Sequence, residues 1–186
     1  MYHKQNHFIR TITYIAMCVA LICVCAWITI PFPIPFTLQI FAVFLIAAVS
    51  DWRISFLSVL AYIGIGVLGV PVFSGFQAGP SVFFGISGGY LLGFLLAALF
   101  IGFMEKLFAH RRGMLWVILF LALLICYCFG VLWYRTVFLS PQDSSSVWQA
   151  IGICVLPFLL PDLIKITLVY VVANRLEPFL HKINCK

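Results

Sequence analysis

The chain has 186 residues, of which 65% are hydrophobic and 9% are charged, with a net charge of +6 and a mean hydropathy of +1.17. A soluble globular domain has about 45 to 50% apolar and about 25% charged residues, so this composition excludes that class and predicts an integral membrane protein. The apolar runs are long and continuous, which favours helices over the alternating strands of an outer-membrane barrel. The expected fold is an all-α transmembrane bundle in a single membrane domain, 1–186.

Charges, prolines and glycines divide the apolar sequence into six candidate transmembrane helices: 11–30, 37–50, 54–72, 83–104, 114–139 and 147–174. The first run follows Lys4 and Arg10 as a signal peptide would, but no small-residue cleavage site follows it, so we expect a retained helix. A spanning helix needs about 20 apolar residues, and the second and third candidates are short by that measure. We expect these two to form a bent hairpin or tilted, partly buried helices.

Lysine and arginine positions predict the orientation, because cytoplasmic loops carry an excess of both residues. With the N-terminus inside, most of the basic residues lie on the cytoplasmic side: Lys4, Arg10, Arg53, Lys106, Arg111, Arg112, Arg175, Lys182 and Lys186. Six spans then place both termini in the cytoplasm. The positive net charge follows from this asymmetry and from attraction to anionic membrane lipid, so it does not indicate a nucleic-acid partner.

Three loops are predicted on the outer side, at 31–36, 69–82 and 140–146. The first two are unusually apolar, with Pro31 to Phe36 and Val70 to Phe73 built mainly from proline, isoleucine, valine and phenylalanine. We expect these segments to pack on the mouth of the bundle or on a bound ligand. Anchoring of the aromatic rings at the membrane interface is the alternative.

Small residues mark close approaches of helices. Ala16 and Ala20 are four residues apart in the first helix, a spacing that lets a second helix approach closely, either within the bundle or from a partner protein. Gly85, Gly89 and Gly93 repeat the spacing later in the chain, beside Tyr90. Their bare face suits a neighbouring helix or a flat polar ligand that the tyrosine ring lies against.

Other motifs argue against cofactor chemistry. The glycines of 64–69 match a dinucleotide fingerprint, but no strand precedes them and no acidic residue follows at the required distance. The seven cysteines form no C-x-x-C pair and have no histidine at metal-ligand spacing, so we expect neither metal nor cofactor. There is no Walker A sequence, so the chain cannot itself drive transport with ATP.

Asp162 and Lys165 lie one turn apart in an apolar stretch, 150–173, that has no other charge. A charge at membrane depth costs at least about 2.5 to 3.5 kcal/mol, and it usually faces a cavity and marks a functional site. At this spacing the two side chains share a helix face and can also neutralise each other. They belong to a small set of polar residues that are available to a ligand near the outer half of the bundle: Thr37, Gln39, Gln77, Ser81, Ser87, Tyr90, Asp162 and Lys165.

Four segments occur in an order that resembles the BioY family: Ile34-Pro35-Phe36-Thr37-Leu38-Gln39, Gly69-Val70-Pro71-Val72-Phe73, Gly85 to Phe94, and Val155 to Lys165. BioY proteins are the biotin-binding substrate (S) components of energy-coupling factor (ECF) vitamin transporters. The resemblance implies a six-helix subunit of a prokaryotic cell membrane that captures biotin at its outer face. Its partners would be a transmembrane coupling protein and two cytoplasmic ATPase subunits.

The resemblance also implies roles for single residues. Asp162 and Lys165 match the family's ligand-contacting pair, and Tyr90 with Gly89 matches its ring-lining segment. Gln77 and Gln39 fall where the family offers polar groups, while Ala16 and Ala20 match the motif that contacts the coupling protein. Two other functions stay open: an S component for another vitamin or a biotin precursor, and a membrane enzyme that uses Asp162 and Lys165 for proton transfer.

Overall fold

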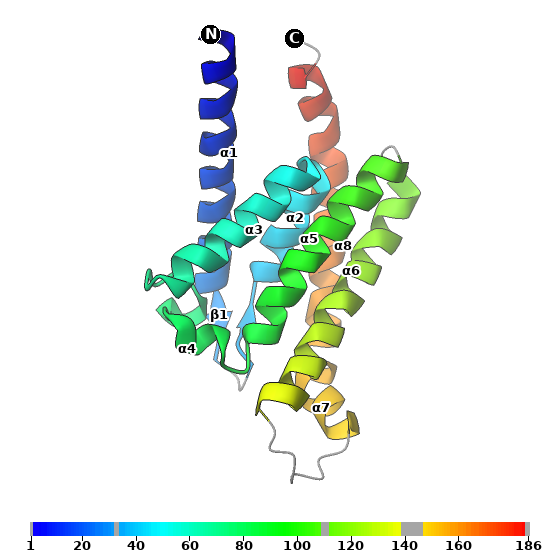
Figure 1. Ribbon diagram of the computed structural model, residues 1–186. Coiled ribbons are helices and arrows are strands. Elements are labelled where there is room, and N and C mark those ends of the chain that lie inside the picture. The colour runs from blue at the N-terminus through cyan, green and yellow to red at the C-terminus, as the bar shows by residue number, and fades with distance from the viewer. Residues whose placement is uncertain (1, 32–33, 109–111, 139–146, 185–186) are drawn as a thin grey trace.

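The computed structural model describes residues 2–31, 34–108, 112–138 and 147–184. Several sequence-based predictions concern positions outside these residues, namely the outer loop 140–146 together with Arg111 and Lys186. Most of the described chain is helical, as predicted (Figure 1).

Four helices are long: α1 (Tyr2–Trp27), α5 (Gly88–Phe108), α6 (Arg112–Trp133) and α8 (Leu156–Asn184). Helices α1, α5 and α8 each contain a segment long and apolar enough to cross a membrane. The corresponding segment of α6 continues beyond the end of that helix, to Val137. Two shorter apolar helices are α2 (Gln39–Val49) and α3 (Trp52–Val67). The smaller elements are β1 (Thr29–Ile30), β2 (Phe36–Thr37), a 3-10 turn (Ser74–Phe76), α4 (Pro80–Phe83), a π turn (Tyr134–Phe138) and α7 (Val147–Cys154).

Helix α2 occupies the centre of the bundle. It packs against α1, α3, α5 and α8, and its most deeply buried side chains are Ala42, Val43, Phe44 and Ala47. Its 11 residues extend only about 16 Å at 1.5 Å per residue, roughly half of the hydrocarbon thickness. The short apolar segment is therefore a core helix, in agreement with the expectation of a partly buried element.

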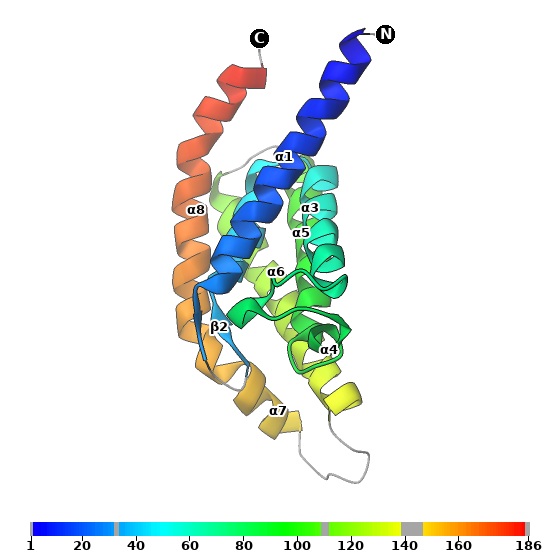
Figure 2. The same ribbon diagram turned by 90° about the vertical axis from the view of Figure 1, so that its left-hand side faces the viewer.

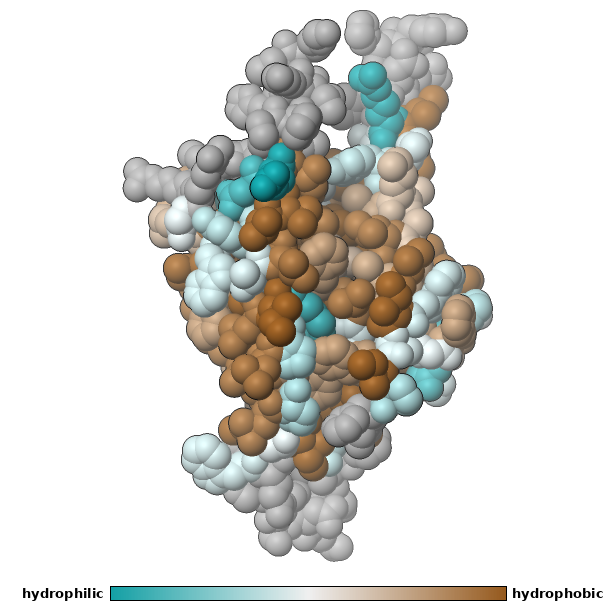
Figure 3. Space-filling view, turned by 180° about the vertical axis from the view of Figure 1, so that it is seen from behind, coloured by the Kyte–Doolittle hydropathy of each residue, from teal (hydrophilic) through white to brown (hydrophobic). Residues whose placement is uncertain are grey.

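The ends of α1 and α8 that carry the chain termini lie together at one end of the molecule (Figures 1 and 2). The β1–β2 hairpin, α4 and α7 lie at the opposite end. Between the two ends, the surface seen from behind is mainly hydrophobic (Figure 3). The predicted outer loops that the structure describes are thus on one side of the apolar middle, away from the termini.

A short antiparallel hairpin replaces the predicted end of the first helix. In it Thr29 pairs with Thr37, and Ile30 pairs with Phe36. Helix α1 ends at Trp27 and α2 begins at Gln39, whereas the sequence predicts that these helices end at 30 and begin at 37. The prolines in this segment lack amide protons and favour extended backbone in the residues before them, which stops the helix early.

The apolar loop after α3 packs into the bundle. Phe73 is 1% exposed and Val72 is also buried, and the Tyr62 hydroxyl donates to the Val72 carbonyl at 3.1 Å. The indole nitrogen of Trp27 donates to the carbonyl of Pro71 at 3.1 Å. Helix α3 ends at Val67 rather than at 72 because the chain reverses at Gly69, whose φ of 104° suits glycine.

The predicted last helix, 147–174, is broken at Val155 into α7 and α8. Pro157 lies in the first turn of α8, where proline is tolerated, and Pro161 lies one turn further along. Neither can donate a backbone hydrogen bond. The amide of Phe158 donates to Val155 at 3.0 Å. The carbonyl of Cys154, which a continuous helix would pair with Phe158, is thereby left for another donor.

The glycine face of α5 meets a helix rather than open space. A Cβ added at Gly93 would lie 2.9 Å from the Cα of Cys126, and one at Gly89 would lie 2.3 Å from the Cβ of Trp133. Both contacts are with α6. Of the two interpretations of the Gly85, Gly89 and Gly93 spacing, close helix packing applies to the last two.

We expect Gly93→Val to destabilise the protein by about 1 to 3 kcal/mol, because the added side chain forces α5 and α6 apart. Gly64→Val is the matched control, since a Cβ at Gly64 meets no atom within 4 Å. Thermal unfolding in detergent micelles measures both variants. Equal melting temperatures for the two would contradict the close packing of α5 on α6.

Candidate functional site

Asp162 and Lys165 form a buried ion pair on the first turns of α8. The Nζ of Lys165 lies 2.7 Å from Oδ1 of Asp162, and the two residues are 4% and 1% exposed, respectively. The three-residue spacing places both side chains on one face of the helix, as the sequence predicted. A lone charge at this depth would be costly, whereas each charge here has an opposite partner within hydrogen-bond distance.

Two aromatic residues complete the surroundings of the pair. The hydroxyl of Tyr127, on α6, donates to Oδ2 of Asp162 at 2.8 Å. The Nζ of Lys165 lies 3.9 Å from the centre of the Phe36 ring, a cation–π contact with the β1–β2 hairpin. Phe36 in turn stacks on Phe158 of α8, with ring centres 6.0 Å apart. The pair is therefore fixed by three elements of the fold: α6, α8 and the hairpin.

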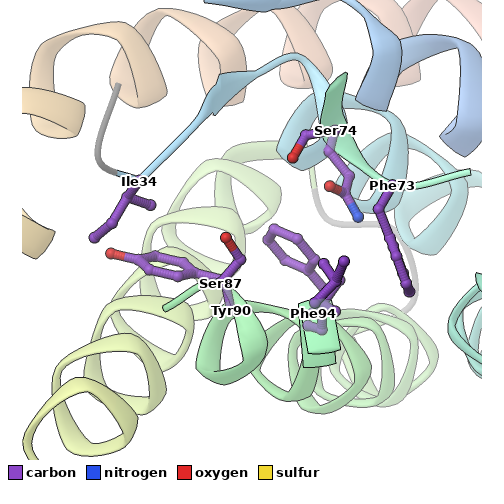
Figure 4. Close-up of a pocket in the computed structure, with 9 residues that line it drawn as sticks. Ile34, Phe73, Ser74, Ser87, Tyr90 and Phe94 are labelled. Carbon is purple, nitrogen blue, oxygen red and sulfur yellow. The ribbon is translucent and has the colours of Figure 1, made fainter. Parts of the chain in front are cut away.

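A cavity lies at the hairpin end of the bundle. It is lined by apolar side chains and a few polar ones: Ile34, Gln39, Phe73, Ser74, Val82, Ser87, Tyr90, Leu91 and Phe94. Figure 4 shows Ile34 on one side and Phe73 with Ser74 on the other, with Tyr90 and Phe94 of α5 between them. An apolar cavity with a small number of polar groups is typical of small-molecule sites.

Gln39 contributes an unused hydrogen-bond donor to this cavity. The residue is 5% exposed, and its Nε2 is buried without a hydrogen-bond partner. A buried amide group that lacks a partner costs free energy, so a ligand acceptor that pairs with it gains that amount on binding. Of the described side chains, Thr29 has the other unpartnered buried polar atom, its hydroxyl on strand β1.

Tyr90 joins the cavity to the break between α7 and α8. Its hydroxyl donates to the Cys154 carbonyl, which the break leaves available. Its ring packs on Gly130 of α6, where an added Cβ would lie 2.7 Å from the ring carbon that carries the hydroxyl. The tyrosine is 8% exposed, so its position is set by α6 on one side and by α7 on the other.

The other predicted site residues have different surroundings. Gln77 is exposed, and its carbonyl accepts from the amide of Phe73, which lines the cavity. Gly89 faces α6. Ala16 and Ala20 lie on an exposed face of α1 together with apolar side chains that the rest of the chain leaves uncovered, Ile12, Met17 and Val24. Asp162 and Lys165 are not among the residues that line the cavity; they lie under the hairpin ring of Phe36.

The sequence did not single out Tyr127 or Phe36 for the ion pair. Tyr127 belongs to an apolar helix in which a tyrosine looks like any other core aromatic residue. Phe36 belongs to an apolar predicted loop and to the first of the family segments, and neither pattern indicates a contact with Lys165. A hydroxyl in the middle of a predicted span was the one available signal, because buried hydroxyls at membrane depth require partners.

Comparison with known proteins places this architecture in a class. A solved structure of the S-component for biotin from an ECF-type ABC transporter has a TM-score of 0.83 with this chain, at 25% identity, and 93% of each chain is covered. The fold and its apolar middle therefore define a multi-pass membrane protein of the ECF S-component type.

The family follows from the sequence comparison. A model of the BioY family matches residues 1–182. The biotin transporter BioY of Thermotoga maritima is 38% identical over 159 residues, which cover 85% of this chain and 90% of the relative. A probable biotin transporter BioY of Pyrococcus horikoshii is 33% identical over 169 residues, 90% of this chain and 96% of the relative. The chain belongs to the BioY family, which confirms the resemblance seen in its motifs.

We expect Asp162→Asn or Lys165→Met alone to lower the free energy of unfolding by about 3 to 5 kcal/mol, because each leaves one buried charge without a partner. The double variant, Asp162→Asn with Lys165→Met, is expected to recover most of that loss. Chemical denaturation in mixed micelles measures all three. If the double variant lost as much free energy of unfolding as the two single variants together, mutual neutralisation would not be the main reason that the buried charges are tolerated.

Proposed function

We propose that this protein is the substrate-binding subunit of a biotin uptake system. It binds biotin from the outer side of the cell membrane of a prokaryote and catalyses no covalent reaction. The observation that carries the proposal is the buried Asp162–Lys165 pair. It occurs in a chain that has an apolar cavity at the hairpin end and whose relatives are biotin transporters. Binding measurements in which other vitamins compete with biotin test the alternative that the protein binds a different vitamin.

The chemistry of biotin suits the residues present. Its ureido group needs both donors and acceptors, its carboxylate needs a cation or hydroxyl donors, and its thiophane ring and valeryl chain need apolar walls. Asp162 and Lys165 supply an acceptor and a cation, and Gln39 supplies an amide nitrogen that lacks a hydrogen-bond partner. Phe73 and Phe94 supply apolar walls. Gln77 extends the proposed site through the loop, and Gly89 contributes through the close packing of α5 on α6, which positions the neighbouring Tyr90.

The proposed membrane arrangement has six helices: α1, α2, α3, α5, α6 and α8. Both termini lie in the cytoplasm, because most of the lysines and arginines are then on the cytoplasmic side of the membrane. The hairpin, α4 and α7 then face outward, where biotin enters. The shared end of α1 and α8 supports this arrangement, since an even number of crossings returns the chain to its starting side (Figure 1).

Import requires partners. We propose that a transmembrane coupling protein binds the uncovered face of α1 at Ala16 and Ala20, and that two cytoplasmic ATPase subunits supply the energy. The small side chains allow a partner helix to approach closely, and the surrounding apolar residues add contact area. The exposed positions of Ala16 and Ala20 support this role.

We expect Lys165→Ala and Asp162→Asn each to weaken biotin binding by at least about 100-fold, because each removes a charge-assisted contact from a desolvated site. Isothermal titration of the purified subunit with biotin measures the effect, with dethiobiotin as a competitor.

The double variant Asp162→Asn with Lys165→Met separates binding from stability. It is expected to be folded and to bind no biotin in the micromolar range. Biotin affinity unchanged from the wild type in this variant would remove both residues from the binding site.

We expect Ala16→Leu with Ala20→Leu to prevent association with the coupling protein, because two larger side chains hold the partner helix away from α1. Biotin binding to the isolated subunit should stay as in the wild type. Co-purification of tagged coupling protein measures the first effect and titration the second. Normal complex formation by this variant would place the contact on another surface.

A further inference from the structure

We propose that Tyr127 is a positioning residue for ligand binding, which acts by holding the carboxylate of Asp162 in place. The inference rests on the proposed function and adds a residue of α6 to it. Tyr127 is 4% exposed, and its hydroxyl donates to Oδ2 of Asp162 at 2.8 Å. Asp162 itself is 1% exposed, so this hydrogen bond lies within the protein interior.

The bond complements the one from Lys165. Lys165 donates to Oδ1 of Asp162, and Tyr127 donates to the other oxygen, Oδ2. Lys165 belongs to the same helix as Asp162, so their contact does not fix α8 relative to its neighbours. Tyr127 belongs to α6 and does fix it. With a donor at each oxygen, the carboxylate is held against rotation, and the ammonium group that it pairs with is held as well.

The hydroxyl has no comparable use in packing. Its ring lies in a helix whose neighbouring buried residues, Leu123 and Cys126, are apolar, and phenylalanine would fill the same volume. A hydroxyl at this depth is costly unless it is paired, and the partner that the structure gives it is the carboxylate. The hydroxyl group of Tyr127 is therefore explained by its hydrogen bond to Asp162 and not by the apolar packing around α6.

The pocket residue Tyr90 is fixed by the same helix, close to Tyr127. Gly130, one turn after Tyr127, provides the space against which the Tyr90 ring packs. Helix α6 thus supports two residues of the proposed site, one through a hydrogen bond and one through a missing side chain. None of the residues that line the cavity belongs to α6, and the sequence predicted no ligand contact in this helix.

The test is Tyr127→Phe, measured for biotin affinity by titration of the purified subunit. We expect the affinity to fall about tenfold, the effect of losing one hydrogen bond to a charged group in a buried site. Tyr14→Phe is the matched control, since it removes a tyrosine hydroxyl that lies 3.0 Å from the Ser50 hydroxyl, well away from Asp162 in the chain. Its affinity should equal that of the wild type.

A double-mutant cycle separates positioning from a general structural effect. In the Asp162→Asn background, Tyr127→Phe should change the affinity less than twofold, because the carboxylate on which it acts is gone. A tenfold loss in both backgrounds would overturn the proposal, as would wild-type affinity in Tyr127→Phe.

Infrared spectroscopy gives a readout that does not depend on biotin. The carboxylate stretching band that disappears in Asp162→Asn should move in Tyr127→Phe and stay in place in Tyr14→Phe; a band unmoved in Tyr127→Phe would overturn the positioning role. If Tyr127→Phe does not fold, a fluorinated tyrosine at position 127 keeps the ring and hydroxyl and should move the same band. A wild-type protein that fails to bind biotin would overturn the proposed function, while the band would still decide the role of Tyr127.

Discussion

The buried ion pair between Asp162 and Lys165 is the interaction on which the proposed site depends. Two charges at membrane depth are tolerated because they lie 2.7 Å apart, because Tyr127 donates a hydrogen bond to the carboxylate, and because the ammonium group lies over the Phe36 ring. Mutual neutralisation and ligand binding are compatible roles for such a pair. A pair that only stabilised the fold would be replaced by apolar residues at little cost, so the presence of two charges in an apolar helix favours a functional role.

The rest of the outer end is arranged around this pair by backbone constraints. Prolines end α1 early and produce the hairpin that carries Phe36 to Lys165. Prolines at the start of α8 break the last helix and leave the Cys154 carbonyl for Tyr90. Proline, which lacks a backbone donor, is thus responsible for two contacts of the site: Phe36 with Lys165, and Tyr90 with the Cys154 carbonyl. Glycines of α5 and α6 add the close packing that holds the two long helices together.

Much of the fold was predictable because hydrophobic length is a local property of the sequence. The long apolar runs predicted α1, α5, α6 and α8, and their short neighbours were expected to be partly buried, as α2 is. The boundaries were less accurate where prolines and glycines gather. The hairpin depends on the pairing of β1 with β2, and the break at Val155 depends on a local change of hydrogen-bond partner, in which the amide of Phe158 donates to Val155; a helical periodicity shows neither.

By itself the sequence determined the membrane class, the family and the pairing of Asp162 with Lys165, because composition, motif order and i,i+3 spacing are all local features. It also identified Gln39 and Tyr90, which line one cavity in the structure. Only the tertiary structure brought Tyr127 to Asp162 and Phe36 to Lys165, across separations of 35 and more than 100 residues. The sequence around a tyrosine or phenylalanine in an apolar run does not indicate which distant residue it contacts, because that contact depends on how whole helices pack.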